Sequence, residues 1–143
     1  MKTRTIVTIL VVAIAAVITA ACGGAKSESS ANEKAIKSTK SGDLTITLSS
    51  ATGELKSGDN DLTLSFADVS GKTVDVGAAS LRFHMPAMGA MAEMNDVASL
   101  TTTNTPGKYH AKVNIEVHGT WEAIVNYEGP KGSGQASLTV NAK

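Results

Sequence analysis

Tyr-His-Ala-Lys-Val-Asn-Ile-Glu-Val, residues 109–117, is a run in which apolar and polar side chains strictly alternate. Successive side chains of a β-strand point to opposite faces, so this pattern is typical of a strand with one buried face. No stretch after residue 22 has helical spacing, and turns rich in Gly, Asp, Asn and Pro separate the alternating runs. Six further runs alternate, less cleanly in places: 44–48, 62–66, 79–85, 97–102, 121–127 and 136–140. Together they predict an all-β fold, a seven-stranded antiparallel sandwich of two sheets.

The first 22 residues have the order of a secretory signal. Met1 to Arg4 is cationic, residues 5–19 are apolar apart from threonines, and Ala20-Ala21-Cys22 follows. We therefore expect a signal peptide over residues 1–21. Ala-Ala-Cys resembles the lipobox of bacterial lipoproteins, although Thr19 stands where that pattern prefers an aliphatic residue. The alternative is an ordinary secretory signal that leaves Cys22 near the new N-terminus.

The lipobox resemblance implies cleavage before Cys22, its diacylation, and a membrane anchor in the bacterial cell envelope. The anchor would lie on the periplasmic face of the outer membrane in a Gram-negative cell, and on the cell surface otherwise. Residues 23–41 are rich in Ser, Lys and Glu, with Ile36 as the one large aliphatic residue. Such a composition cannot bury a core, so residues 22–41 are predicted to be the lipidated Cys and a disordered tether.

The composition of the predicted folded domain, residues 42–143, and of the whole chain argues against several classes of protein. It holds seven basic and eleven acidic residues, a net charge of −4. A nucleic-acid binder needs a clustered basic surface, so no nucleic-acid partner is expected. The single Cys rules out an intramolecular disulfide and a Cys-rich zinc site. No Ser-His-Asp arrangement or paired carboxylates stand in a pocket-like context, so we do not predict an enzyme.

The candidate chemistry lies in His-Met-Pro-Ala-Met-Gly-Ala-Met-Ala-Glu-Met, residues 84–94. Pro86 and Gly89 predict a loop or an irregular strand end. Methionines recur at every third position, and flexible spacing of this kind can turn several thioethers toward one point. Thioether sulfur is a soft ligand that selects Cu(I), and imidazole also suits copper. The predicted copper ligands here are His84, Met85, Met88, Met91 and Met94.

Two other histidines are further possible ligands. His118 precedes Gly119 at a predicted turn and is a further candidate. His110 lies eight residues earlier, roughly 27 Å along a strand, so the two cannot share an ion. For each of them a solvent-facing position on a polar row is the favoured alternative. The methionines also have a packing interpretation: Met85 continues an inward row, and the others could form an apolar flap for a partner.

Several motifs resemble the YtkA-like domain family over roughly residues 42–141. These are Leu-Thr-Leu-Ser-Phe-Ala-Asp (62–68), Leu-Arg-Phe-His-Met-Pro-Ala-Met-Gly-Ala-Met (81–91), Pro-Gly-Lys-Tyr (106–109) and Gly-Thr-Trp-Glu-Ala-Ile-Val (119–125). The resemblance implies an immunoglobulin-like sandwich, often found on bacterial lipoproteins or fused to periplasmic heavy-metal efflux adaptors. It also implies kinship with FixH-type domains associated with copper transport into oxidases. Met85, Met88 and Met91 match the methionine block of the family, and Met94 lies beyond it.

Two functions follow as expectations. The first is an envelope lipoprotein that binds Cu(I) through the methionine loop, as a carrier or buffer in metal handling. Its partners would be a copper transporter, an efflux adaptor or an oxidase-assembly protein. The second is a non-metal interaction module that docks a membrane complex through the methionine flap.

Overall fold

The computed structural model describes residues 32–130 and 132–143. The predicted signal peptide 1–21, Cys22 and the first part of the predicted tether lie outside the described residues. In the described part of the chain, no helix is long and apolar enough to cross a membrane. The regular structure of these residues consists of nine strands: β1 (Lys34–Ser41), β2 (Leu44–Ser50), β3 (Gly58–Ala67), β4 (Ala78–Met85), β5 (Met94–Val97), β6 (Ser99–Thr102), β7 (Lys108–Ile115), β8 (Gly119–Gly129) and β9 (Gly132–Ala142).

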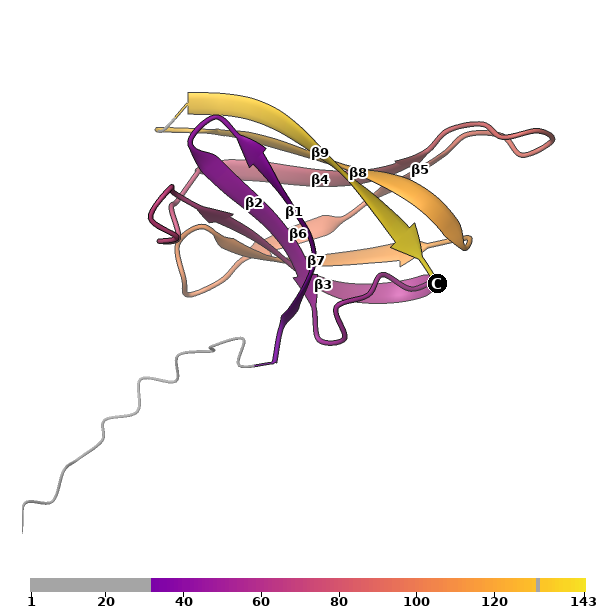
Figure 1. The fold of residues 1–143 in the computed structure, drawn as a ribbon, viewed down its shortest axis with the longest axis horizontal. Helices are drawn as coiled ribbons and strands as arrows, with labels where there is room; N and C mark the ends of the chain where they lie inside the picture. The colour runs from indigo at the N-terminus through magenta and orange to yellow at the C-terminus, as the bar shows by residue number, and fades with distance from the viewer. Residues whose placement is uncertain (1–31, 131) are drawn as a thin grey trace, which may run out of the picture.

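The strands form two antiparallel sheets packed as a sandwich (Figure 1). One sheet has the order β1-β2-β3-β7-β6 and the other the order β5-β4-β8-β9. Without β1, these orders match strands A-B-E-D and C′-C-F-G of immunoglobulin domains. The predicted immunoglobulin-like sandwich is therefore confirmed, with an additional N-terminal strand at the edge of the first sheet.

The strand count and the start of the domain differ from the prediction. The residues 34–41 assigned to the tether form β1, which pairs with β2 from Lys34↔Ser50 to Ser41↔Leu44. Ile36 packs against the core, and the polar neighbours are tolerated because an edge strand exposes much of its surface. The run predicted as one strand, 97–102, is broken at Ala98, because β5 belongs to one sheet and β6 to the other.

The core fills the space between the inward rows of the two sheets. Phe66 makes edge-to-face contacts with Tyr109 and Tyr127, with ring centroids 5.8 and 5.6 Å apart. Trp121 is fully buried, and its indole N–H donates a hydrogen bond of 3.1 Å to the carbonyl of Val117. Every residue of this core lies between Ile36 and Ala142. The core of the described residues is therefore continuous within the segment 32–143.

Candidate functional site

Strands β4 and β5 form a hairpin whose loop carries the methionines. The register pairs Arg82 with Val97 at one end and Met85 with Met94 at the other. Beyond an unpaired stretch, Met88 and Met91 pair again: the N–H of each donates to the carbonyl of the other, at 3.1 and 3.0 Å. The pairing register is thus the same at the base and at the tip of the hairpin. In Figure 1 this hairpin extends well beyond the body of the sandwich.

The tip is a two-residue loop, Gly89-Ala90, between the paired residues Met88 and Met91. Gly89 has a φ of +58°, while no residue other than glycine has a positive φ in the described part of the chain. This combination is that of a type II′ turn, which requires glycine at its first central position. Met88 and Met91 are therefore direct cross-strand neighbours, with Cα atoms about 5.5 Å apart and side chains on one face. We call them the tip pair; they are 51% and 43% exposed.

The other two methionines, Met85 and Met94, form a separate inner pair at the base. Met85 is only 2% exposed, and Met94 is half-buried against the core. The terminal methyl of Met85 lies 3.1 Å from the position that a Cβ on Gly119 would occupy, so it packs over a residue without a side chain. Moving Met85 out of the core to bind a metal would cost about 1.5–3 kcal/mol. The sequence predicts that the four sulfurs can turn toward one point. The structure instead divides the four methionines into two pairs.

His84 lies at the base of the hairpin, on the face opposite to buried Met85. It is half-buried, and its Nδ1 is 3.0 Å from the amide oxygen of Asn95. An amide oxygen only accepts, so in the tautomer in which Nδ1 donates this hydrogen bond, Nε2 is the nitrogen with a lone pair that a metal could use. Glu122 of β8 is the register partner of His84. Met88 stands four positions after His84, about 13 Å along an extended chain, so His84 does not join the tip pair.

The remaining histidines lie away from the tip. His118 is exposed in the loop between β7 and β8, next to Gly119 and thus near the base of the hairpin. His110 is exposed on β7, in the other sheet, where it pairs with Thr63 and Thr101. The structure therefore places neither histidine beside the tip pair.

One feature of the hairpin base did not emerge from the sequence: a half-buried carboxyl on β5. Oδ2 of Asp96 is buried and has no hydrogen-bond partner among the described residues. Burial raises the pKa of Asp96 above its ordinary value of 3.8, and the charge of Glu116 raises it further, although a hydrogen bond from the backbone N–H of Glu116 lowers it. The sequence signal that could have revealed this carboxyl is the alternation of Met94, Asp96 and Ala98, which places an acidic residue in an inward row.

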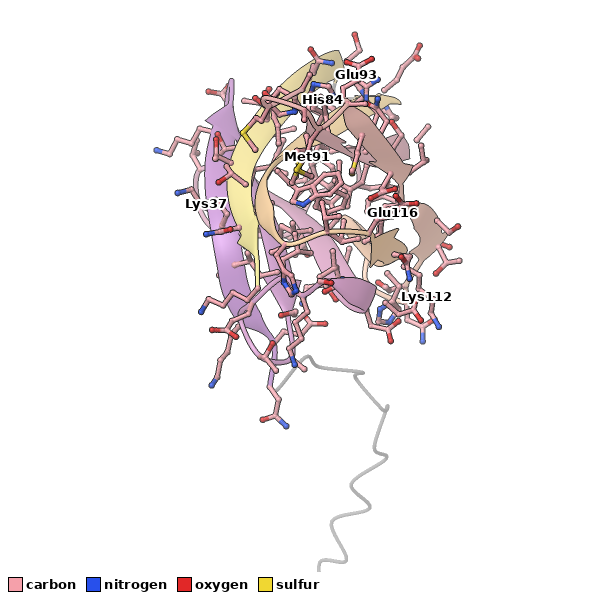
Figure 2. The ribbon with its side chains drawn as sticks, turned by 90° about the vertical axis from the view of Figure 1, so that its right-hand side faces the viewer. Lys37, His84, Met91, Glu93, Lys112 and Glu116 are labelled. Atoms are coloured by element: carbon pink, nitrogen blue, oxygen red, sulfur yellow. The ribbon has the colours of Figure 1, made fainter. Side chains whose placement is uncertain are left out.

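Figure 2 looks onto the end of the molecule from which the hairpin projects, with Met91 and Glu93 on the hairpin and Glu116 to one side. Among the described residues, no three His, Cys, Asp or Glu side chains gather as a metal site. A centre built from imidazole and carboxylate groups is thus missing from this part of the chain. The tip pair, two adjacent and exposed thioethers, is the arrangement best suited to a soft metal.

Comparisons with known proteins place the chain in a family. A search of curated proteins finds no match. Among solved structures, FetP of uropathogenic E. coli strain F11 superposes with a TM-score of 0.44 and 11% sequence identity, over 75% of this chain and 93% of that chain. The model of the YtkA-like family matches residues 38–126, more than half of the chain. The chain therefore belongs to the YtkA-like family.

Proposed function

We propose that this protein is an envelope-anchored carrier or buffer of Cu(I) and that the tip pair supplies the metal ligands. The supporting observation is the type II′ turn at Gly89, which sets two exposed thioethers side by side. Thioether sulfur is soft and prefers Cu(I) to hard cations. In an oxidising compartment free thiols are scarce, which leaves methionine as the soft donor for such a site.

The two methionine pairs have different roles in this proposal. The inner pair is packed against the core and anchors the hairpin to the sandwich. The tip pair is free to reorient, because methionine has three rotatable bonds and the tip is open to solvent. Of the ligands predicted from the sequence, Met88 and Met91 remain in the proposed set, whereas His84 and His118 lie too far from the tip.

A titration tests this assignment. The segment 32–143 is titrated with Cu(I) under reducing conditions against a competing chelator. We expect the double variant Met88→Leu/Met91→Leu to lose binding. The control Met85→Leu/Met94→Leu should keep it, because leucine preserves apolar volume in the core. If the tip variant binds copper as tightly as the parent, the assignment is wrong.

The location is a second part of the proposal, and it depends on Cys22. The Ala-Ala-Cys sequence supports lipidation, and several acyl chains hold a protein on a bilayer where one chain does not. A copper transporter, an efflux adaptor or an oxidase-assembly protein would then be the exchange partner at the membrane. Replacing Cys22 with Ser should move the protein from the membrane fraction to the soluble envelope fraction. Unchanged sedimentation with membranes would contradict the anchor.

The composition of the tip favours an alternative function, docking to a membrane complex without metal. All residues from Pro86 to Ala92 are exposed, and none is charged. Methionine also forms adaptable binding surfaces for protein partners. If the parent ignores copper but captures a membrane partner that the tip-pair variant loses, the docking function replaces the copper function.

A further inference from the structure

The tip pair is an incomplete coordination sphere. It offers two neutral sulfur atoms, whereas Cu(I) accepts up to four soft ligands. Within the described residues, the next soft donor on the hairpin is Met94, three residues from Met91 or about 10 Å along the strand. Met94 is also half-buried on the core side. Within the described residues, no further soft donor lies beside the tip pair, and a second copy of the chain is one source of the missing ligands.

The shape and charge of the tip permit the close approach of another tip. The residues that flank the tip pair are Ala87, Gly89, Ala90 and Ala92, all small and exposed. Glu93 is exposed just behind the tip, two residues or about 7 Å from Met91. Two facing tips would bring two such carboxylates toward each other, which repels them at close range unless a cation lies between them. The same geometry thus disfavours contact without metal and favours it with metal.

We propose that two copies of this chain bind one Cu(I) between their hairpin tips, each copy contributing its tip pair. This inference rests on the proposed function, since it needs the tip pair to be a ligand. The resulting site has four thioethers related by a twofold axis, an isologous contact in which the same residues of both copies meet. The hairpin extends beyond the sandwich, so the two sandwiches do not collide when the tips meet (Figure 1).

The stoichiometry of copper tests the inference. The segment 32–143 is mixed with Cu(I) at increasing ratios, and its mass is followed by sedimentation velocity. We expect a doubling of mass at half an equivalent of Cu(I), and a return to monomer when excess copper gives each tip its own ion. The Met88→Leu/Met91→Leu variant should stay monomeric at all ratios. The Met85→Leu/Met94→Leu control should dimerise as the parent does.

A charge at the tip separates this inference from the proposed function. Ala90→Glu leaves both sulfurs in place but adds a second carboxylate to each tip, so we expect it to weaken the dimer at least tenfold relative to Ala90→Gln. A parent that binds copper yet stays monomeric at half an equivalent overturns the shared site and leaves the proposed function standing. A parent that does not bind copper overturns both. A dimer that forms without copper, or that survives loss of the tip pair, shows that the copies meet elsewhere.

Discussion

Replacing Met85 with Ala should unfold the sandwich far more readily than replacing Met88 with Ala, although both residues belong to one hairpin. Met85 is 2% exposed and Met88 is 51% exposed. Truncating a buried Met to Ala removes apolar contacts and leaves a cavity, at a cost of about 2–5 kcal/mol. An exposed substitution away from special features changes stability by less than about 0.5 kcal/mol. The two variants remove the same atoms, so the difference measures burial alone.

The assay is urea unfolding of the segment 32–143, with thermal unfolding as a second readout. For a segment of this size, about 1 kcal/mol corresponds to roughly 4 °C, so Met85→Ala should lower the Tm by about 8–20 °C. The urea midpoint should fall without a change in slope, because the surface exposed on unfolding is nearly the same. Copper binding should respond in the opposite order, strongly to Met88→Ala and weakly to Met85→Ala below the melting range. Equal losses of stability in the two variants would refute the division of the methionines into inner and tip pairs.

Three further predictions concern the same hairpin. Gly89→Ala keeps both sulfurs of the tip pair but places a side chain at a φ of +58°. Holding Ala in this left-handed conformation costs about 1–2 kcal/mol, so Cu(I) binding should weaken by about 5- to 30-fold in the chelator competition. Asp96→Asn should stabilise the segment at pH 7. Burial and the charge of Glu116 raise the pKa of Asp96 above 3.8 in the folded protein, so the parent loses stability as the pH rises through this raised pKa. The stability gained from Asn should vanish below pH ~3, where Asp96 is protonated, and urea unfolding at a series of pH values would show this. Hydrogen peroxide should convert the tip pair to sulfoxides before the inner pair, as peptide mass spectrometry would show, because accessible thioethers react first. Equal oxidation of the two pairs would contradict the burial of Met85.

Most of the sandwich follows from two-residue periodicity, because an inward row of apolar side chains is what a packed sheet requires. Strand β1 could not be found in this way. A bulge between Ala35 and Lys37 shifts its register, so its sequence does not alternate cleanly. Most of its contacts are with β2 and β9, and a side-chain hydrogen bond joins Ser38 Oγ to Thr47 Oγ1 of β2 at 2.8 Å. A strand that depends on its neighbours leaves little local signal.

The break at Ala98 was invisible for a different reason. The residues on either side of it form short strands that belong to different sheets, and a crossing between sheets has no periodic pattern of its own. Val97 is 73% exposed although it stands in an apolar-looking run. Asp96, by contrast, lies on the inward side. Which side chains of this segment point inward therefore depends on where the chain crosses from the sheet of β5 to the sheet of β6, which only the tertiary structure determines.

The sequence could name the candidate methionines but could not divide them into a buried pair and an exposed pair, and their spacing explains why. A spacing of three keeps side chains near one face of a helix, whereas in a strand it alternates faces at every step. Once Pro86 and Gly89 rule out a helix, a single face for all four sulfurs is excluded. What remains to be fixed is the register, and the type II′ turn fixes it by pairing Met88 with Met91. The same register then pairs Met85 with Met94 on the core side. One turn thus makes two methionines part of the fold and leaves the other two exposed, so the proposed copper site at the tip could change without disturbing the core.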